Sequence, residues 1–412
     1  KYYQDSYNLP DEWFAGALDD SVTYADSVYS AQLDILVPDI RGISPGVKVL
    51  VFDECFNGAF IYDSYVAGEY IFGSGNSVVG IANTVNVKQD IWLSEMIGLL
   101  NYGVRVGNWH RNFNFIESHI IGDPTYHFSG SGKTDLNRAL TVDAGKLSLW
   151  KKMLRSADVP LQVLAINRLT ELSGEAFADD LVDIYHANPS FTVRMSVLLA
   201  LAQLNTPEFH SLLTESIKDP YELIRRISTV WMAEIGSDAY LPLLAEAAVS
   251  DNGKRVSFQA KNALQTLNPA AAAVAVDQYQ ATLPGPEMAY TYDYRGALER
   301  TVANLEEDFA VISDTTTIAS KRISKIRTFR NYKYHNSLPA LFELAADNSE
   351  DIAVRTVIIE ALGWYHYSWQ RPAIEKVCQS IVADSAVPEA VRLEAVKTLA
   401  RLDQGCNNPL AP

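Results

Sequence analysis

FTVRMSVLLALAQL, residues 191–204, decides the fold of the larger part of this chain. Its apolar residues recur at helical spacing, with alanines among them, which is typical of a helix packed against other helices. YELIRRISTVWMAEIG (221–236) repeats the pattern, and its Arg225 corresponds to Arg194 in the first segment. A repeat of about 30 residues indicates helical hairpins stacked on one another.

Five further segments repeat this pattern along the chain. They lie at 159–172, 252–267, 321–334, 350–365 and 388–402, the first three in weaker form. Arg355 and Arg392 occupy places equivalent to those of Arg194 and Arg225. Because one hairpin cannot bury its apolar face alone, the units are expected to stack into an all-α, curved solenoid.

A basic residue near the start of the second helix of each hairpin resembles the pattern of the HEAT repeat family. The resemblance covers roughly residues 147–404 and implies an architecture and a binding role, not a particular ligand. We therefore assign 147–412 to a HEAT-like helical repeat domain. Within it, residues 268–315 break the period and are predicted to form a long connection between repeats.

Residues 1–130 have a different texture, with glycine-rich turns between short β-branched and aromatic runs. Continuous apolar runs of strand type lie at 47–52, 77–85 and 119–122, and residues 89–104 have helical spacing. Continuous rather than alternating apolar runs favour strands buried on both faces, as in a parallel sheet covered by helices. The sequence predicts an α/β domain over 1–130 and a linker over 131–146.

VLVFDECFNGAF (49–60) places Cys55 directly after one of these predicted strands. This segment resembles the cysteine segment of the gingipain-type peptidases, a family with a caspase-like fold. Segments at 75–92, 95–109 and 120–128 are similar, in the same order, to that family's next strand, following helix and terminal strand. The resemblance implies the C-terminal part of a caspase-like parallel sheet, a cysteine endopeptidase with Cys55 as nucleophile, and an extracytoplasmic location.

The family carries a histidine followed by glycine upstream of its cysteine, and here the best counterpart is Ala15-Gly16. Gly16 would contribute to the oxyanion hole, whereas Ala15 stands where the catalytic histidine is expected. Because alanine cannot accept a proton, Cys55 would lack its general base. Three explanations stay open: a naturally inactive pseudo-peptidase, a variant made inactive on purpose, or a histidine in an upstream fragment that completes the domain.

Each of the remaining candidate residues could have a structural role instead of a functional one. The resemblance implies a substrate pocket around Trp92, Thr84 and Asn86, and packing in a core or loop is the alternative role for each. Cys55 itself has the alternative of a buried, inert residue. The histidines that follow it, His110, His119 and His127, come in the wrong order for this family.

Composition narrows the choice of partner. The formal net charge of −16, from 34 basic and 50 acidic residues, would repel nucleic acid and favours a basic or polar partner. No apolar run approaches the ~20 residues that a membrane helix needs. No H-E-x-x-H pair or C-x-x-C spacing predicts a metal, and no cofactor is indicated.

Two functions follow from these features. The first is a cysteine endopeptidase that carries a protein-binding solenoid. The second is a catalytically inactive pseudo-peptidase that acts as a scaffold for a protein or peptide partner.

Overall fold

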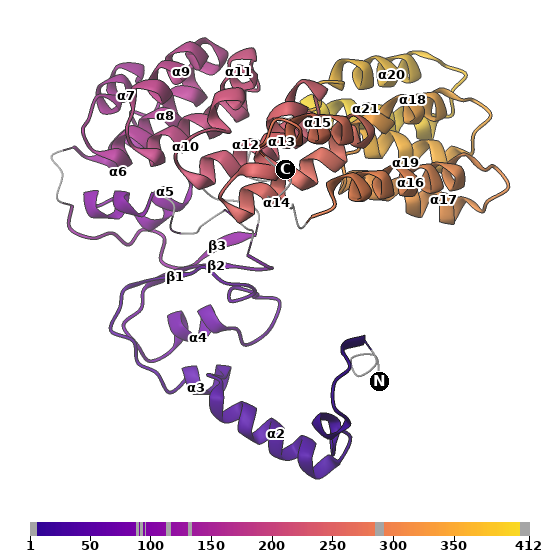
Figure 1. Ribbon diagram of the computed structural model, residues 1–412. Coiled ribbons are helices and arrows are strands. Elements are labelled where there is room, and N and C mark those ends of the chain that lie inside the picture. The colour runs from indigo at the N-terminus through magenta and orange to yellow at the C-terminus, as the bar shows by residue number, and fades with distance from the viewer. Residues whose placement is uncertain are drawn as a thin grey trace. The chain divides into compact units, whose positions relative to one another are not determined.

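The computed structural model describes residues 6–87, 90, 94, 96–112, 117–130, 134–284 and 292–403. The chain forms two compact units, Lys1–Lys146 and Leu147–Pro412. Among the described residues, strands occur in the first unit, whereas the second is built of helices (Figure 1). No described helix is both long and apolar enough to cross a membrane.

The first unit contains a three-stranded sheet in the order β1-β2-β3, formed by Val49–Phe52, Val79–Asn83 and Ser118–Gly122. The central strand β2 is buried along its whole length, and the edge strand β1 is half-buried. The three predicted strands are therefore present.

The prediction of a parallel sheet was wrong for β3. β1 and β2 are parallel, but β3 is antiparallel to β2, with Ser118 opposite Asn83. β3 thus enters the sheet at the end where β2 leaves it, and an apolar run carries no information on strand direction. The described residues form a small mixed sheet rather than a caspase-like parallel one.

The first unit also contains helices of 4 to 14 residues. They are η1 Asp11–Phe14, α2 Asp20–Leu33, α3 Val37–Ile40, α4 Val66–Phe72, η2 Ile97–Tyr102, α5 Val106–His110 and α6 Leu136–Thr141. Ala67 and Ile71 of α4 pack against Ala82 and Ile121 of the sheet. This contact forms a core between the helix and the sheet.

Two predictions about helical content in the first unit were wrong. The single helix expected over 95–109 is divided into η2 and α5, because Gly103 between them has a φ of +73° that a continuous helix cannot contain. The predicted linker 131–146 contains α6, with Leu136 and Leu140 buried. The described part of this segment is therefore packed structure.

The second unit consists of successive helical hairpins (Figure 1). Its helices are α7 Leu147–Leu154, α8 Val159–Ser173, η3 Gly174–Phe177, α9 Ala178–Ala187, α10 Phe191–Leu204, α11 Pro207–Ser216, α12 Glu222–Ile235, η4 Asp238–Tyr240, α13 Leu241–Ser250, α14 Lys254–Leu267, α15 Pro269–Gln280, α16 Tyr294–Ser313, α17 Ala319–Arg327, η5 Thr328–Arg330, η6 His335–Ser337, α18 Leu338–Ala346, α19 Ile352–Leu362, α20 Arg371–Ala383 and α21 Glu389–Asp403. The predicted helical solenoid is confirmed.

The prediction of a long connection over 268–315 was wrong. Most of this stretch forms α15 and α16, which pack against each other and against α13 and α14. α15 is rich in alanine, which forms helices readily but offers little of the large apolar pattern by which a repeat is recognised. Asn268 starts it by accepting a hydrogen bond from the Ala271 N–H.

Contacts distant in sequence join the end of α12 to two later connections, and we call this group the clasp. The Lys333 ammonium lies 2.7 Å from the Glu234 carboxylate, and the Trp369 N–H donates to the Ile235 carbonyl at 2.8 Å. The ring of His335 lies within hydrogen-bond distance of the Ala233 carbonyl, and burial lowers its pKa to about 4. The clasp therefore holds together residues 99 positions apart.

Candidate functional site

Arg194 on α10 binds two turns of the chain. One is the α9–α10 turn of its own hairpin, and the other is the α11–α12 turn of the next hairpin. Its Nε and Nη2 donate to the carboxylate of Asp219 at 2.8 and 3.0 Å. Its Nη1 donates to the carbonyls of Asn188 and Pro189. A two-pronged guanidinium–carboxylate pair of this kind has a defined orientation as well as strength.

Asp219 accepts more than the arginine. The Tyr185 hydroxyl and the Tyr221 N–H both donate to its carboxylate, at 2.7 and 2.8 Å. Burial, the largest single influence, raises the pKa of this carboxyl, but the hydrogen bonds from Arg194, Tyr221 and Tyr185 together hold the pKa below its ordinary value. Asp219 is thus a buried anion whose charge is compensated on several sides.

Arg225 on α12 repeats this geometry one hairpin later. It donates to the Asp251 carboxylate at 2.7 and 3.0 Å and to the carbonyls of Asp219 and Pro220. The Asp251 carboxylate also accepts from the Gly253 N–H, so it orders the turn before α14. We call this chain of pairs the ladder; it joins consecutive hairpins through the turns between their helices.

The ladder has a weaker rung before Arg194 and stops after Arg225. The position equivalent to these arginines is Gln162 in the preceding hairpin, which accepts from the Asn188 side chain at 3.1 Å. In the following hairpin it is Ser257, which donates only to backbone carbonyls. A hydroxyl is too short to reach the next turn.

The later arginines behave differently from the first two. Arg355 donates to the Ala345 carbonyl and the Asn348 side chain, and Arg392 donates to the Val387 carbonyl. Of the four arginines predicted to be equivalent, Arg194 and Arg225 make carboxylate pairs. Sequence reasoning missed both acceptors, although each follows its arginine after 25 or 26 residues. Arg322, which the sequence analysis did not single out, lies at the same fourth position of α17 and donates through two nitrogens to the Glu350 carboxylate.

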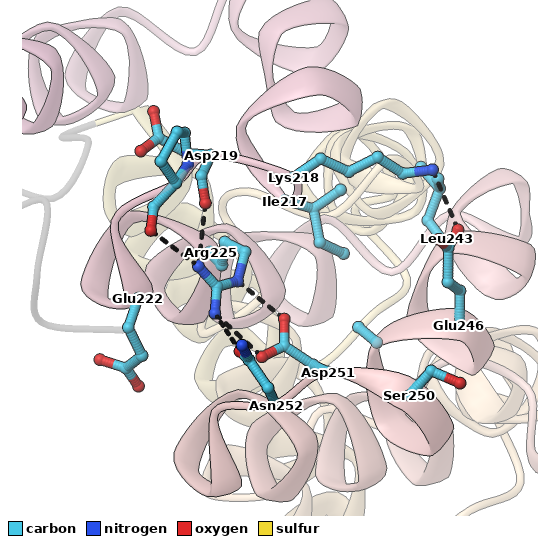
Figure 2. A pocket seen from close by; sticks show the side chains of 12 residues that line it. Ile217, Lys218, Asp219, Glu222, Arg225, Leu243, Glu246, Ser250, Asp251 and Asn252 are labelled. Carbon is cyan, nitrogen blue, oxygen red and sulfur yellow. Dashed lines mark hydrogen bonds and ion pairs between the residues drawn. The ribbon is translucent and has the colours of Figure 1, made fainter. Parts of the chain in front are cut away.

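A pocket of about 670 Å³ lies beside the ladder, between the ends of the hairpins α11–α12 and α13–α14 (Figure 2). Its lining includes four carboxylate side chains and two cationic ones: Asp219, Glu222, Glu246, Asp251, Lys218 and Arg225. Figure 2 shows Arg225 held between Asp219 and Asp251. Each of the four carboxylates already has a cationic partner, in Arg194, Arg226, Lys218 and Arg225. The pocket is therefore rich in carboxylates without a net negative charge.

One rim of the pocket is more adaptable. Lys218 and Glu246 form an ion pair at 3.0 Å, with 58% and 42% of their side chains exposed. Exposed pairs of this kind contribute little and exchange partners readily. Glu246 is thus able to accept a cation from another molecule.

Comparison with known proteins bears on this part of the chain. Residues 178–265, which span the ladder arginines and the pocket, match the family described as HEAT repeats. The chain contains HEAT repeats. No curated protein matches it.

Two solved structures are similar to the chain. Human deoxyhypusine hydroxylase in complex with glycerol is 16% identical, with 65% of this chain and 99% of that chain covered and a TM-score of 0.25. The Escherichia coli protein YIBA is also 16% identical, with 66% of this chain and 89% of that chain covered and the same TM-score.

The structure brings Cys55 next to the segment that follows β2. Cys55 is exposed directly after β1, and the Val87 N–H donates to its Sγ at 3.3 Å. Thr84 is half-buried and donates its hydroxyl and N–H to the Glu117 carbonyl, whereas Asn86 is exposed. The predicted nucleophile and two of the predicted pocket residues are therefore neighbours.

The other predicted peptidase residues are not brought to Cys55. Ala15 and Gly16 follow η1, and the nearest side chain to Gly16 is that of Val22 on α2. Trp92 lies outside the described residues. The catalytic and substrate-binding roles stay predictions.

His119 lies near the residues that follow Cys55. Its position after Cys55 in the sequence is the wrong order for the catalytic histidine of the peptidase family. Its ring packs edge-on against Phe60 and faces Gly58, where a Cβ would lie 2.6 Å from the ring. Burial lowers the pKa of His119, and its two ring nitrogens have no hydrogen-bond partner among the residues that the structure describes. Gly58 was the available signal, since only glycine leaves room for the ring.

Proposed function

We propose that this chain is a protein-binding scaffold whose HEAT repeats hold a basic or polar segment of a partner protein in the pocket beside the ladder. The observation that carries this function is a pocket located where consecutive hairpins meet, with the exposed carboxylate of Glu246 at its rim. The ladder makes the walls rigid, because Arg194 and Arg225 fix the turns that form them. A preorganised site binds with a smaller loss of conformational entropy.

The exposed carboxylate at the rim of the pocket favours a cationic side chain of the partner. The positive charge of Arg225 is compensated by the Asp251 carboxylate. Glu246 can exchange its exposed partner Lys218 for an incoming cation. The net charge of −16 would speed the approach of a basic partner over longer distances. A lysine or arginine beside Glu246 is the expected contact.

Fluorescence anisotropy with basic, neutral and acidic peptides of equal length tests this function. The full chain is expected to bind the basic peptides in preference, and Glu246→Lys should weaken that binding by about tenfold or more, because it places two ammonium groups at the rim. Glu306→Lys on α16 changes the net charge equally at an exposed site away from the pocket. Equal binding of all peptides, or equal loss in both variants, would refute the proposal.

A gingipain-type cysteine endopeptidase is the second candidate, and an extracytoplasmic location would accompany it. The exposure of Cys55 and the N–H directed at its Sγ support this candidate. The general base would have to come from a histidine other than the residue at position 15, which is alanine.

A thiol-directed peptidyl probe distinguishes this candidate from a silent domain. The peptidase requires labelling of Cys55 that is faster with the peptidyl probe than with a small maleimide, because binding of the peptide raises the local concentration of the reactive group. Cys55→Ala is the matched control. Labelling by the maleimide without labelling by the peptidyl probe would exclude the candidate.

A further inference from the structure

The helix α14 exposes a basic face in an acidic protein. Lys254, Arg255, Phe258, Lys261 and Asn262 lie at spacings that place them on one side of the helix, and we call this group the α14 face. Its opposite side is buried in the repeat stack through Val256, Ala260, Ala263, Leu264 and Leu267. The helix KRVSFQAKNALQTL contains no aspartate or glutamate.

The cations of the α14 face are without acidic partners. Within the described residues no ion pair is recorded for Lys254, Arg255 or Lys261, although the chain carries 50 acidic side chains. By contrast, Lys218 and Arg225 in the preceding hairpin are both paired with carboxylates. Lys254 and Arg255, both exposed, are therefore available to another molecule.

An apolar anchor lies among these cations. Phe258 is 57% exposed, one turn beyond Lys254 and one turn before Asn262. Lys261 lies over the ring of Tyr292, 4.2 Å from its centroid, which adds a second aromatic side chain to the same side. Aromatic residues and arginine are enriched in protein interfaces, whereas lysine is more common on the rest of the surface.

The ladder ends before α14, and this explains why the cations of the α14 face are not used inside the stack. In α10 and α12 the arginine on the fourth helical residue is used to tie the next turn. In α14 the equivalent residue is Ser257, so this helix uses no cation inside the stack. Its cations lie instead at positions that face solvent.

We propose that the α14 face binds an acidic segment of a partner protein, with an aromatic or aliphatic side chain of that segment packed on Phe258. Carboxylates would pair with Lys254 and Arg255, of which arginine can bind one through two nitrogens. This surface is distinct from the pocket beside the ladder and goes beyond the proposed function there. Three cations on one helix match a short acidic segment, whereas the net charge of −16 opposes a long nucleic-acid backbone.

Titration of the full chain with a fluorescent peptide of alternating glutamates around one phenylalanine tests this inference. The peptide is expected to bind, and added salt should weaken the binding. The double variant Lys254→Glu/Arg255→Glu should bind the peptide about tenfold or more weakly. Phe258→Ala should also weaken the binding. Lys151→Glu/Lys152→Glu on α7 is the matched control, because it reverses two exposed neighbouring lysines elsewhere.

The outcomes separate this surface from the pocket. Glu246→Lys should leave binding of the acidic peptide unchanged, whatever its effect on basic peptides. Absent binding, equal losses in the α7 and α14 double variants, or tighter binding of single-stranded nucleic acid than of the peptide would each overturn the proposal. Circular dichroism of every variant confirms that the helices are intact.

Discussion

Asp219→Ala is expected to destabilise the repeat domain by about 3–5 kcal/mol, because it leaves the guanidinium of Arg194 buried without its anion. The substitution also removes the acceptor for the Tyr185 hydroxyl and the Tyr221 N–H. Only 2% of the Asp219 side chain and 14% of the Arg194 side chain are exposed, so water cannot replace the lost contacts. The free energy of unfolding, from urea titration followed by circular dichroism, measures the loss.

Two companion variants identify the cause. Asp219→Asn keeps an acceptor oxygen and should lose less, whereas Asp183→Ala on the exposed side of α9 should change stability little. Because the pKa of Asp219 is lower in the folded than in the unfolded protein, its contribution to stability depends on pH. The contribution is complete above the unfolded pKa of about 3.9 and is lost as pH falls through the lower folded pKa. A loss in Asp219→Ala no larger than that in Asp183→Ala would contradict the role of the ladder.

Gly236→Ala is expected to cost about 3 kcal/mol or more, since it combines backbone strain with a collision in the clasp. Gly236 ends α12 with a φ of +69°, and a Cβ there would lie 2.1 Å from the ring of His335. His335 is itself buried and held by Ala233 and Ser368, so its ring cannot move aside. Thermal unfolding of the full chain is the direct measurement.

Asn205→Ala serves as the control for backbone strain without a collision; it also removes the contact between the Asn205 side chain and the ring of His210, 3.1 Å long. Asn205 ends α10 in the same left-handed conformation, with a φ of 51°, so its replacement by alanine should cost about 1–2 kcal/mol. Combining Gly236→Ala with His335→Ala should recover part of the loss, because the small side chain leaves room for the new Cβ. Strictly additive losses in this pair would show that the collision is not the cause.

The sequence predicted the helical repeats well because their signal is local. The apolar pattern of 191–204 and 221–236 depends on neighbouring turns of one helix, and Arg194 and Arg225 have a constant place in it. By the same reasoning α15 was missed, because alanine carries too weak a pattern. In the first unit, apolar runs located the strands but could not give the direction of β3.

The candidate site was predictable only in part. Cys55 was predicted from its place after a strand, and the structure exposes it there. Its catalytic role stays a prediction. The pocket beside the ladder was not found, because its carboxylates lie on separate helices and turns and have no common spacing. The α14 face could have been recognised from the absence of acidic residues in one amphipathic helix.

The sequence by itself determined that this protein contains a helical solenoid, since a helical period and a recurrent arginine are properties of short segments. The tertiary structure alone decided which carboxylate each arginine binds, where the pocket opens, and that Gly236 must make room for His335. These features join residues 25 to 102 positions apart. Such contacts form only when the hairpins stack, so no local pattern records them.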